Sequence, residues 1–231
     1  MTERGGSIVK SRGEVTEAQA STLFVFNPAE PHAGWMGRSE RWQYRSLYLT
    51  QAALDQVARE LGVEAVPYFT GTLFGDSDLI DGFLAMHRAI EQGRDVFHER
   101  ELLVGTFGRL FQRHGSRGGR IEPGPRDRAL LDKVMERMRA GYASDLGLEE
   151  LAAEVGLTIF QLIGLFRRTV GLPPHACLTQ VRLGMACRHL RHSRAIAEVA
   201  TDVGFYDQSA LTRHFKRCYG ITPLQFARAA A

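Results

Sequence analysis

LEELAAEVGL at residues 148–157 recurs with nearly the same apolar pattern as IAEVATDVGF at residues 196–205. Each copy is followed by a second short segment that ends in Phe and two basic residues, at residues 166–168 and 215–217. Self-similarity of this kind indicates one supersecondary unit used twice. Helical spacing on both sides of an internal Gly predicts a helix, a tight turn and a second helix in each copy, which is the layout of a DNA-binding helix-turn-helix.

Residues 126–231 are predicted to be all helix apart from short turns. The expected helices lie within residues 126–142, 148–169 (the first helix-turn-helix unit), 174–191, 196–218 (the second unit) and from 223 to the end. The helix that connects the two units would be about 27 Å long, which is close to the roughly 34 Å of one turn of duplex. The sequence therefore predicts that the two units enter adjacent major grooves of double-stranded DNA.

The second helix of the second unit is predicted to read bases. Asp207 is a good N-cap, and the spacing of Leu211 and Phe215 predicts that both are buried. The opposite face is polar and carries no carboxylate; its residues are Gln208, Ser209, Thr212, Arg213 and Lys216. Arg can bond guanine and Gln adenine bidentately, each pair discriminating by roughly 1–3 kcal/mol. Lys216 and Arg217 are better placed for phosphates. An ordinary solvated face would look similar, but the repeat and the cap favour a reading helix.

The first unit offers fewer groups that can reach bases. Thr158 and Gln161 have the spacing of a capping box, so the second helix of this unit is expected to start there. Ile163 and Gly164 stand where the second unit has Thr212 and Arg213. The remaining candidates for DNA contact are Phe160, Gln161, Arg167 and Arg168. We therefore expect most sequence discrimination to come from the second unit.

The N-terminal half is predicted to contain a few strands followed by helices. Strands are expected at residues 23–26 and 42–49, and the strand-forming region either extends back through residues 8–15 or is incomplete. Thr50 is expected to cap a helix, and amphipathic helices are expected at residues 76–92 and 96–113. The fold class is therefore α+β, with an all-α C-terminal domain.

Residues 114–125 are predicted to be the linker between two domains, 1–113 and 126–231. Four glycines and two prolines in this stretch interrupt any helix. The formal net charge is +3, and it divides into −2 for residues 1–125 and +5 for residues 126–231. Positive charge concentrated on the domain with the repeat fits a polyanionic partner.

The bulk composition excludes several classes of protein. With 44% hydrophobic and 24% charged residues, the chain is neither disordered nor fibrous. No apolar run approaches the roughly 20 residues that span a bilayer, and the N-terminus lacks the apolar core of a secretory signal. Three cysteines without metal-type spacing fit a cytoplasmic location. His32 alone makes no metal site, so no metal and no cofactor are expected.

The segment from Gly204 to Pro223 (GFYDQSALTRHFKRCYGITP), together with the two units joined by a long helix, closely resembles the AraC family of bacterial transcription regulators. The resemblance covers about residues 126–231. It implies that one set of residues faces DNA in the second unit, namely Gln208, Ser209, Ala210, Thr212 and Arg213. It implies Phe160, Ile163 and Gly164 as their partners in the first unit.

The N-terminal half resembles the sensing and dimerisation domain of the same family less specifically. Residues 27–32 (NPAEPH) and 44–49 (YRSLYL) resemble the second part of its cupin-like barrel, and the first part is expected to be missing. The resemblance implies a small-molecule effector, a homodimer through the helices at 76–113, and contact with RNA polymerase if the protein is an activator.

Three functions remain open from the sequence. The leading one is a sequence-specific transcription regulator that responds to a small molecule. The second is an effector-independent DNA-binding remnant with a truncated sensing domain. The third is a cupin-type enzyme with a DNA-binding appendage, which would need clustered metal ligands or a nucleophile with its base. We find no such set and predict that the protein is not an enzyme.

Overall fold

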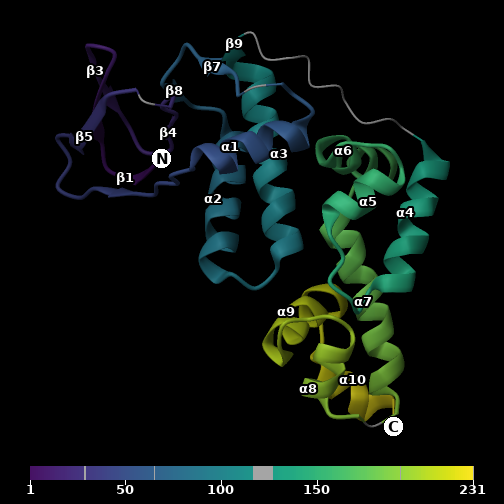
Figure 1. Ribbon diagram of the computed structural model, residues 1–231. Helices are drawn as coiled ribbons and strands as arrows, with labels where there is room; N and C mark the ends of the chain where they lie inside the picture. The colour runs from purple at the N-terminus through teal and green to yellow at the C-terminus, as the bar shows by residue number, and fades with distance from the viewer. Residues whose placement is uncertain (29, 65, 117–126, 193, 231) are drawn as a thin grey trace. The chain divides into compact units, whose positions relative to one another are not determined.

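The computed structural model describes residues 1–28, 30–64, 66–116, 127–192 and 194–230 (Figure 1). Its contacts divide the chain into two compact units. The first unit comprises residues 1–93 and 102–122, and the second comprises residues 94–101 and 123–231. Among the described residues, no helix combines the length and the apolar character that crossing a membrane requires.

Short antiparallel strands make up the N-terminal part of the first unit. They are β1 (Thr2–Arg4), β2 (Ser7–Ser11), β3 (Glu14–Ala18), β4 (Leu23–Phe24), β5 (His32–Met36), β6 (Gln43–Tyr44), β7 (Tyr68–Phe69), β8 (Leu73–Phe74) and β9 (Gly115–Ser116). The widest of the described sheets has the order β3-β2-β5, and the other pairs are β1-β6, β4-β8 and β7-β9. Arg12 and Gly13 both have positive φ at the β2–β3 turn, which is the geometry that a tight hairpin prefers.

The predicted strands are shorter than expected. The strand at 23–26 is limited to β4, and the strand at 42–49 is limited to β6. The proposed extension through residues 8–15 is confirmed, because β2 and the start of β3 lie there. β5 was not expected, since HAGWM has no alternation of polar and apolar residues and lies exposed along its whole length.

Three helices complete the first unit: α1 (Gln51–Leu61), α2 (Ser77–Gln92) and α3 (Val96–His114). The predicted cap of α1 is confirmed, because Thr50 Oγ1 accepts a hydrogen bond from the Ala53 N–H at 3.2 Å. The predicted linker begins later than residue 114. His114 is the last residue of α3 and lies 2.9 Å from an Asp76 carboxylate oxygen, and β9 follows it. Residues 117–125 of that linker lie outside the described residues.

The rest of the second unit is helical, as the sequence predicts. Its helices are α4 (Arg128–Gly141), α5 (Leu148–Glu154), α6 (Ile159–Val170), α7 (Pro174–Leu190), α8 (Ile196–Asp202), α9 (Gln208–Tyr219) and α10 (Pro223–Ala230). α5 and α6 form the first helix-turn-helix unit, and α8 and α9 form the second, with α7 between them (Figure 1). Phe166 and Phe215, which end the two repeats, are fully buried.

Candidate nucleic-acid interface and effector cavity

The turns of the two helix-turn-helix units share one backbone conformation. Gly156 has φ +67° and Gly204 has φ +85°, a region that residues with a Cβ enter at a cost. Ala152 and Ala200, one turn earlier, are buried as predicted, so the two helices of each unit approach closely. These features of the sequence therefore fix the direction in which α6 and α9 leave their turns.

The surroundings of the two glycines differ. A Cβ built on Gly156 would meet nothing within 4 Å, whereas one on Gly204 would lie 2.8 Å from the Tyr142 carbonyl oxygen and 2.9 Å from Arg182 Nε. Arg182 Nε donates a 2.8 Å hydrogen bond to that same carbonyl. Arg182 of α7 therefore supports the turn of the second unit from behind.

The buried face of α9 follows the prediction, with one correction. Asp207 caps the helix by accepting a hydrogen bond from the Ala210 N–H at 2.6 Å. Leu211 and Phe215 are fully buried. Ala210 is only 8% exposed and belongs to the core cluster formed with α7 and α8. The implication that Ala210 faces DNA is therefore wrong, because its methyl group is part of that core.

The opposite face of α9 is open to solvent. The exposed members of the predicted set are Gln208, Ser209, Arg213, Lys216 and Arg217, and Thr212 is half-buried. The Thr212 hydroxyl donates to the Gln208 carbonyl at 2.8 Å, which leaves its methyl group outward. Within the described part of the chain, Arg213 and Lys216 form no ion pair, so their charges are available to a ligand.

The α6 helix offers a smaller polar surface. Its capping box is confirmed: Thr158 Oγ1 accepts from the Gln161 N–H at 3.2 Å, and Gln161 Oε1 accepts from the Thr158 N–H at 3.0 Å. The Gln161 side chain is thereby turned back onto its own helix. Phe160 is half-buried, and Arg167 is exposed.

Two residues of α6 need separate comment. Ile163 is 3% exposed, so the implication that it faces DNA is wrong, since it packs in the core. The Arg168 guanidinium lies over Gly164, where a Cβ would collide with it. The absence of a side chain at Gly164 therefore gives Arg168 a place to lie across the helix.

A largely apolar cavity of about 410 Å³ lies within the first unit. Its wall includes several aromatic side chains, among them Phe26, Phe69, Phe83, Phe107 and Phe111. The few polar residues that line it include Asn27, His32 and Thr106, and among the described residues its lining contains no Asp, Glu, Lys or Arg. This volume and this lining fall in the range of small-molecule sites.

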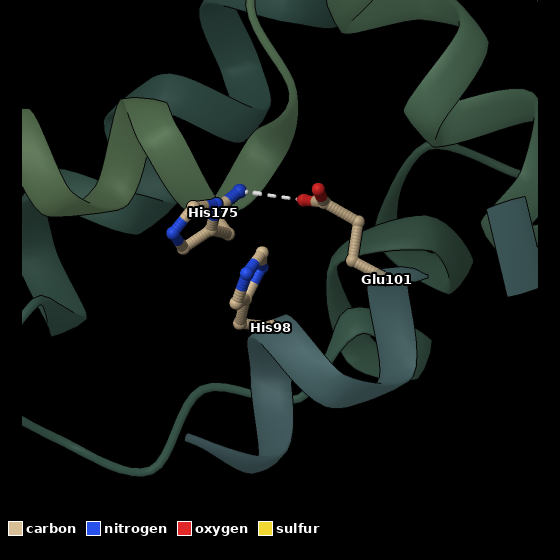
Figure 2. Close-up of side chains that lie close together, drawn as sticks. All are labelled: His98, Glu101 and His175. Carbon is tan, nitrogen blue, oxygen red and sulfur yellow. Dashed lines mark hydrogen bonds between the residues drawn. The ribbon is translucent and has the colours of Figure 1, made fainter. Parts of the chain in front are cut away.

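The sequence analysis missed a cluster formed by His98, Glu101 and His175, all of the second unit (Figure 2). The imidazole rings of His98 and His175 stack with centroids 3.7 Å apart. Glu101 Oε2 accepts a 2.7 Å hydrogen bond from the His175 backbone N–H. Burial raises the pKa of Glu101 to about 7, lowers the pKa of His175 to about 3, and also lowers the pKa of His98. Spacing along the chain gives no sign of this cluster, because α3 and α7 are distant in sequence.

Comparison with known protein families covers both halves of the chain. Residues 1–110 match a family model described as an AraC-like ligand binding domain, and residues 151–229 match one described as a helix-turn-helix domain. Each half of the chain thus has its own match, in the order that the structure shows.

Two curated bacterial proteins illustrate the similarity. The chain is 32% identical over 127 residues to the HTH-type transcriptional activator RhaR of Escherichia coli K12, a match that covers 54% of this chain and 45% of RhaR. It is 24% identical over 188 residues to YbfI of Bacillus subtilis, described as an uncharacterized HTH-type transcriptional regulator, with 81% of this chain and 68% of YbfI covered. The match thus spans less than half the length of RhaR.

Solved structures resemble part of the chain. One is an AraC-type transcriptional regulator from Chromobacterium violaceum, with 24% identity and a TM-score of 0.43, covering 45% of this chain and 93% of that one. Another is the DNA-binding domain of AdpA in complex with a target DNA, with 29% identity and a TM-score of 0.40, covering 43% of this chain and 90% of that one.

Proposed function

Because the chain belongs to the AraC family of transcription regulators, we propose that it binds a specific double-stranded DNA site through its two helix-turn-helix units. α9 supplies most of the base contacts, and α6 mainly holds the DNA backbone. This division assigns the base-reading role to Gln208, Ser209, Thr212 and Arg213.

The observation that carries this proposal is the exposed polar face of α9. Arg213 and Lys216 lie one turn apart on that face and have no ion-pair partner among the described residues. Gln208 is at the N-terminal end of the helix, which is the end that contacts base edges in helix-turn-helix proteins. A positive face without an internal counter-charge favours a polyanion, and its Gln and Arg provide bidentate groups for bases.

The first unit is proposed to position the DNA. Arg167 is exposed, and Arg168 lies across Gly164 on the same helix, so both guanidinium groups suit phosphates. Gln161 is engaged in the capping box through its carbonyl oxygen, which leaves only its amino group for a base. Phe160 remains available for the methyl group of a thymine.

A small-molecule effector is proposed for the cavity of the first unit. Since its lining is mostly aromatic and aliphatic and includes no charged side chain among the described residues, the expected effector is uncharged and largely apolar. A sugar would leave most of its hydroxyl groups without hydrogen-bond partners there. This cavity favours an effector-responsive regulator over the effector-independent remnant.

The remaining assignments follow the division into a sensing part, residues 1–113, and a DNA-binding part, residues 126–231. α2 and α3 are the proposed homodimer surface, and Val96 is an apolar side chain that is 74% exposed at the start of α3. Contact with RNA polymerase is proposed if the protein activates transcription. Sedimentation of the chain at several concentrations tests the dimer, and a monomer at all of them would exclude it.

The test of DNA recognition can be carried out on a protein whose operator has not been identified. The full chain is used to select binding sites from a pool of random duplexes, and the selected duplex is titrated against a random one at fixed salt. We expect a ratio of about 10³ or more between the two affinities. A ratio of about tenfold or less would remove the proposed function. A change of affinity on adding candidate apolar metabolites tests the effector separately.

A further inference from the structure

We propose that His98, Glu101 and His175 form a binding site for a divalent first-row transition-metal ion, with Zn²⁺ as the expected occupant. One potential ligand atom of each residue lies within 4.8 Å of those of the other two. His98 and Glu101 are three residues apart on α3, which places them on one face of the helix. His175 comes from the first turn of α7. Figure 2 shows the two rings facing each other with the carboxylate beside them.

The polar atoms of this cluster are poorly satisfied by the protein. Nδ1 of His98 and Nδ1 of His175 are both buried without a hydrogen-bond partner in the described part of the chain. Glu101 is only 3% exposed, and its carboxylate accepts a hydrogen bond from a neutral backbone N–H. Buried lone pairs and a buried carboxylate without a cation are costly. A bound metal ion would satisfy all three groups at once.

The chemistry of the ligands selects the class of ion. Two imidazoles and one carboxylate suit Zn²⁺ and its first-row neighbours, whereas Mg²⁺ and Ca²⁺ prefer oxygen ligands alone. Three protein ligands leave one position of a tetrahedral Zn²⁺ for water. Arg182 and Arg217 act electrostatically on His175, and their positive charge opposes a cation. The expected affinity is therefore micromolar rather than tighter.

A structural role competes with metal binding for these residues. Pro173 precedes α7 and makes no side-chain cap, so Glu101 serves α7 as a cap from another helix by accepting the His175 N–H. The stacked rings also have to turn before their nitrogens converge on one ion. An experiment must therefore separate capping and stacking from coordination.

The test uses the full chain without a polyhistidine tag, stripped with a chelator. Zn²⁺ is titrated by calorimetry, and Co²⁺ is titrated by visible absorption, whose intensity and position report the coordination geometry and any thiolate ligand. We expect one equivalent to bind without a thiolate band. His98→Ala and His175→Ala should each weaken binding at least about tenfold. His192→Ala, at an exposed histidine after α7, should leave it unchanged.

Glu101→Gln distinguishes a ligand from a cap. The Gln carbonyl oxygen can still accept the His175 N–H, so the unfolding temperature of the metal-free protein should stay close to that of the unmodified chain. Zn²⁺ affinity should nevertheless fall, because an amide oxygen is a much weaker ligand than a carboxylate. Full Zn²⁺ affinity in Glu101→Gln and in both histidine variants would overturn the proposal. Failure of the unmodified chain to bind either ion above the level of random surface sites would overturn it as well.

Discussion

The turn glycines of the two helix-turn-helix units provide a matched pair for a stability measurement. Gly156→Ala and Gly204→Ala place the same methyl group at equivalent positions of the repeat. Both residues have positive φ, so both substitutions carry the cost of a left-handed residue with a Cβ, about 1–2 kcal/mol. We expect Gly156→Ala to cost no more than this, because its Cβ would meet nothing within 4 Å.

Gly204→Ala is expected to cost more because of what lies behind the turn. The new Cβ would lie 2.8 Å from the Tyr142 carbonyl oxygen and 2.9 Å from Arg182 Nε, well inside normal contact. Relief of this overlap requires the two groups to move, which breaks the 2.8 Å hydrogen bond between them. A hydrogen bond from a charged donor to a partly buried acceptor is worth roughly 1–3 kcal/mol. The expected total is about 2–5 kcal/mol, and α9 should be displaced with the turn.

Urea unfolding of the full chain measures this difference. The two tryptophans, Trp35 and Trp42, both lie in the first unit, so fluorescence follows that unit while helical circular dichroism includes the second. The Gly204→Ala midpoint should fall in circular dichroism and stay unchanged in fluorescence. Gly184→Ala in α7, where a Cβ meets open space, is the control and should stabilise by up to about 1 kcal/mol.

Equal losses for Gly156→Ala and Gly204→Ala would refute this reasoning, and so would a larger loss for Gly156→Ala. Either result would mean that the contact with Arg182 does not limit the turn. Selected-site DNA affinity provides an independent check. It should drop more for Gly204→Ala than for Gly156→Ala, because the direction of α9 depends on the second turn.

Three further predictions concern recognition and pH. Arg213→Ala should relax base preference at one position and cost about 1–3 kcal/mol of DNA binding; repeated site selection checks this, and a greater loss for Gln161→Ala would reverse the ranking of the two units. Lys216→Ala should weaken binding to all duplexes alike and reduce the salt slope by about one, which titrations at several salt concentrations measure. For Glu30, burial raises the pKa, but hydrogen bonds from Arg12, Ser11 and Asn27 outweigh it and hold the pKa at about 2, below the usual 4.5. The stability from these bonds is therefore present above pH 4.5 and lost as the pH falls towards 2, and Glu30→Gln should abolish this part of the acid sensitivity of urea midpoints.

Local signals in the sequence were sufficient for the helices of the second unit. Gly204 defines its turn, Asp207 caps α9, and the spacing of Leu211 and Phe215 defines the buried face. Each of these depends on residues within two turns of helix. The polar stripe of α9 followed from the same periodicity, which is why the exposure of Arg213 was predictable.

Features that depend on distant residues were not predictable. Ala210 and Ile163 were assigned to DNA by resemblance, but their burial depends on how α9 and α6 pack against other helices. The strands of the first unit are too short for period-two alternation to define their ends. The approach of His98 to His175 depends on the packing of α3 against α7, to which no local pattern refers.

The two units have diverged on both faces while keeping one backbone. Behind the turn, the second unit gained the Arg182 hydrogen bond to Tyr142, and the first unit has open space at Gly156. On the front, the second unit presents Arg213, and the first presents Gly164 under the Arg168 side chain. Recognition of bases requires a side chain held to within about half an ångström, whereas phosphate contact tolerates more freedom. Rigid support therefore occurs in the unit that bears the bidentate groups, and this coincidence is the strongest structural reason to assign specificity to α9.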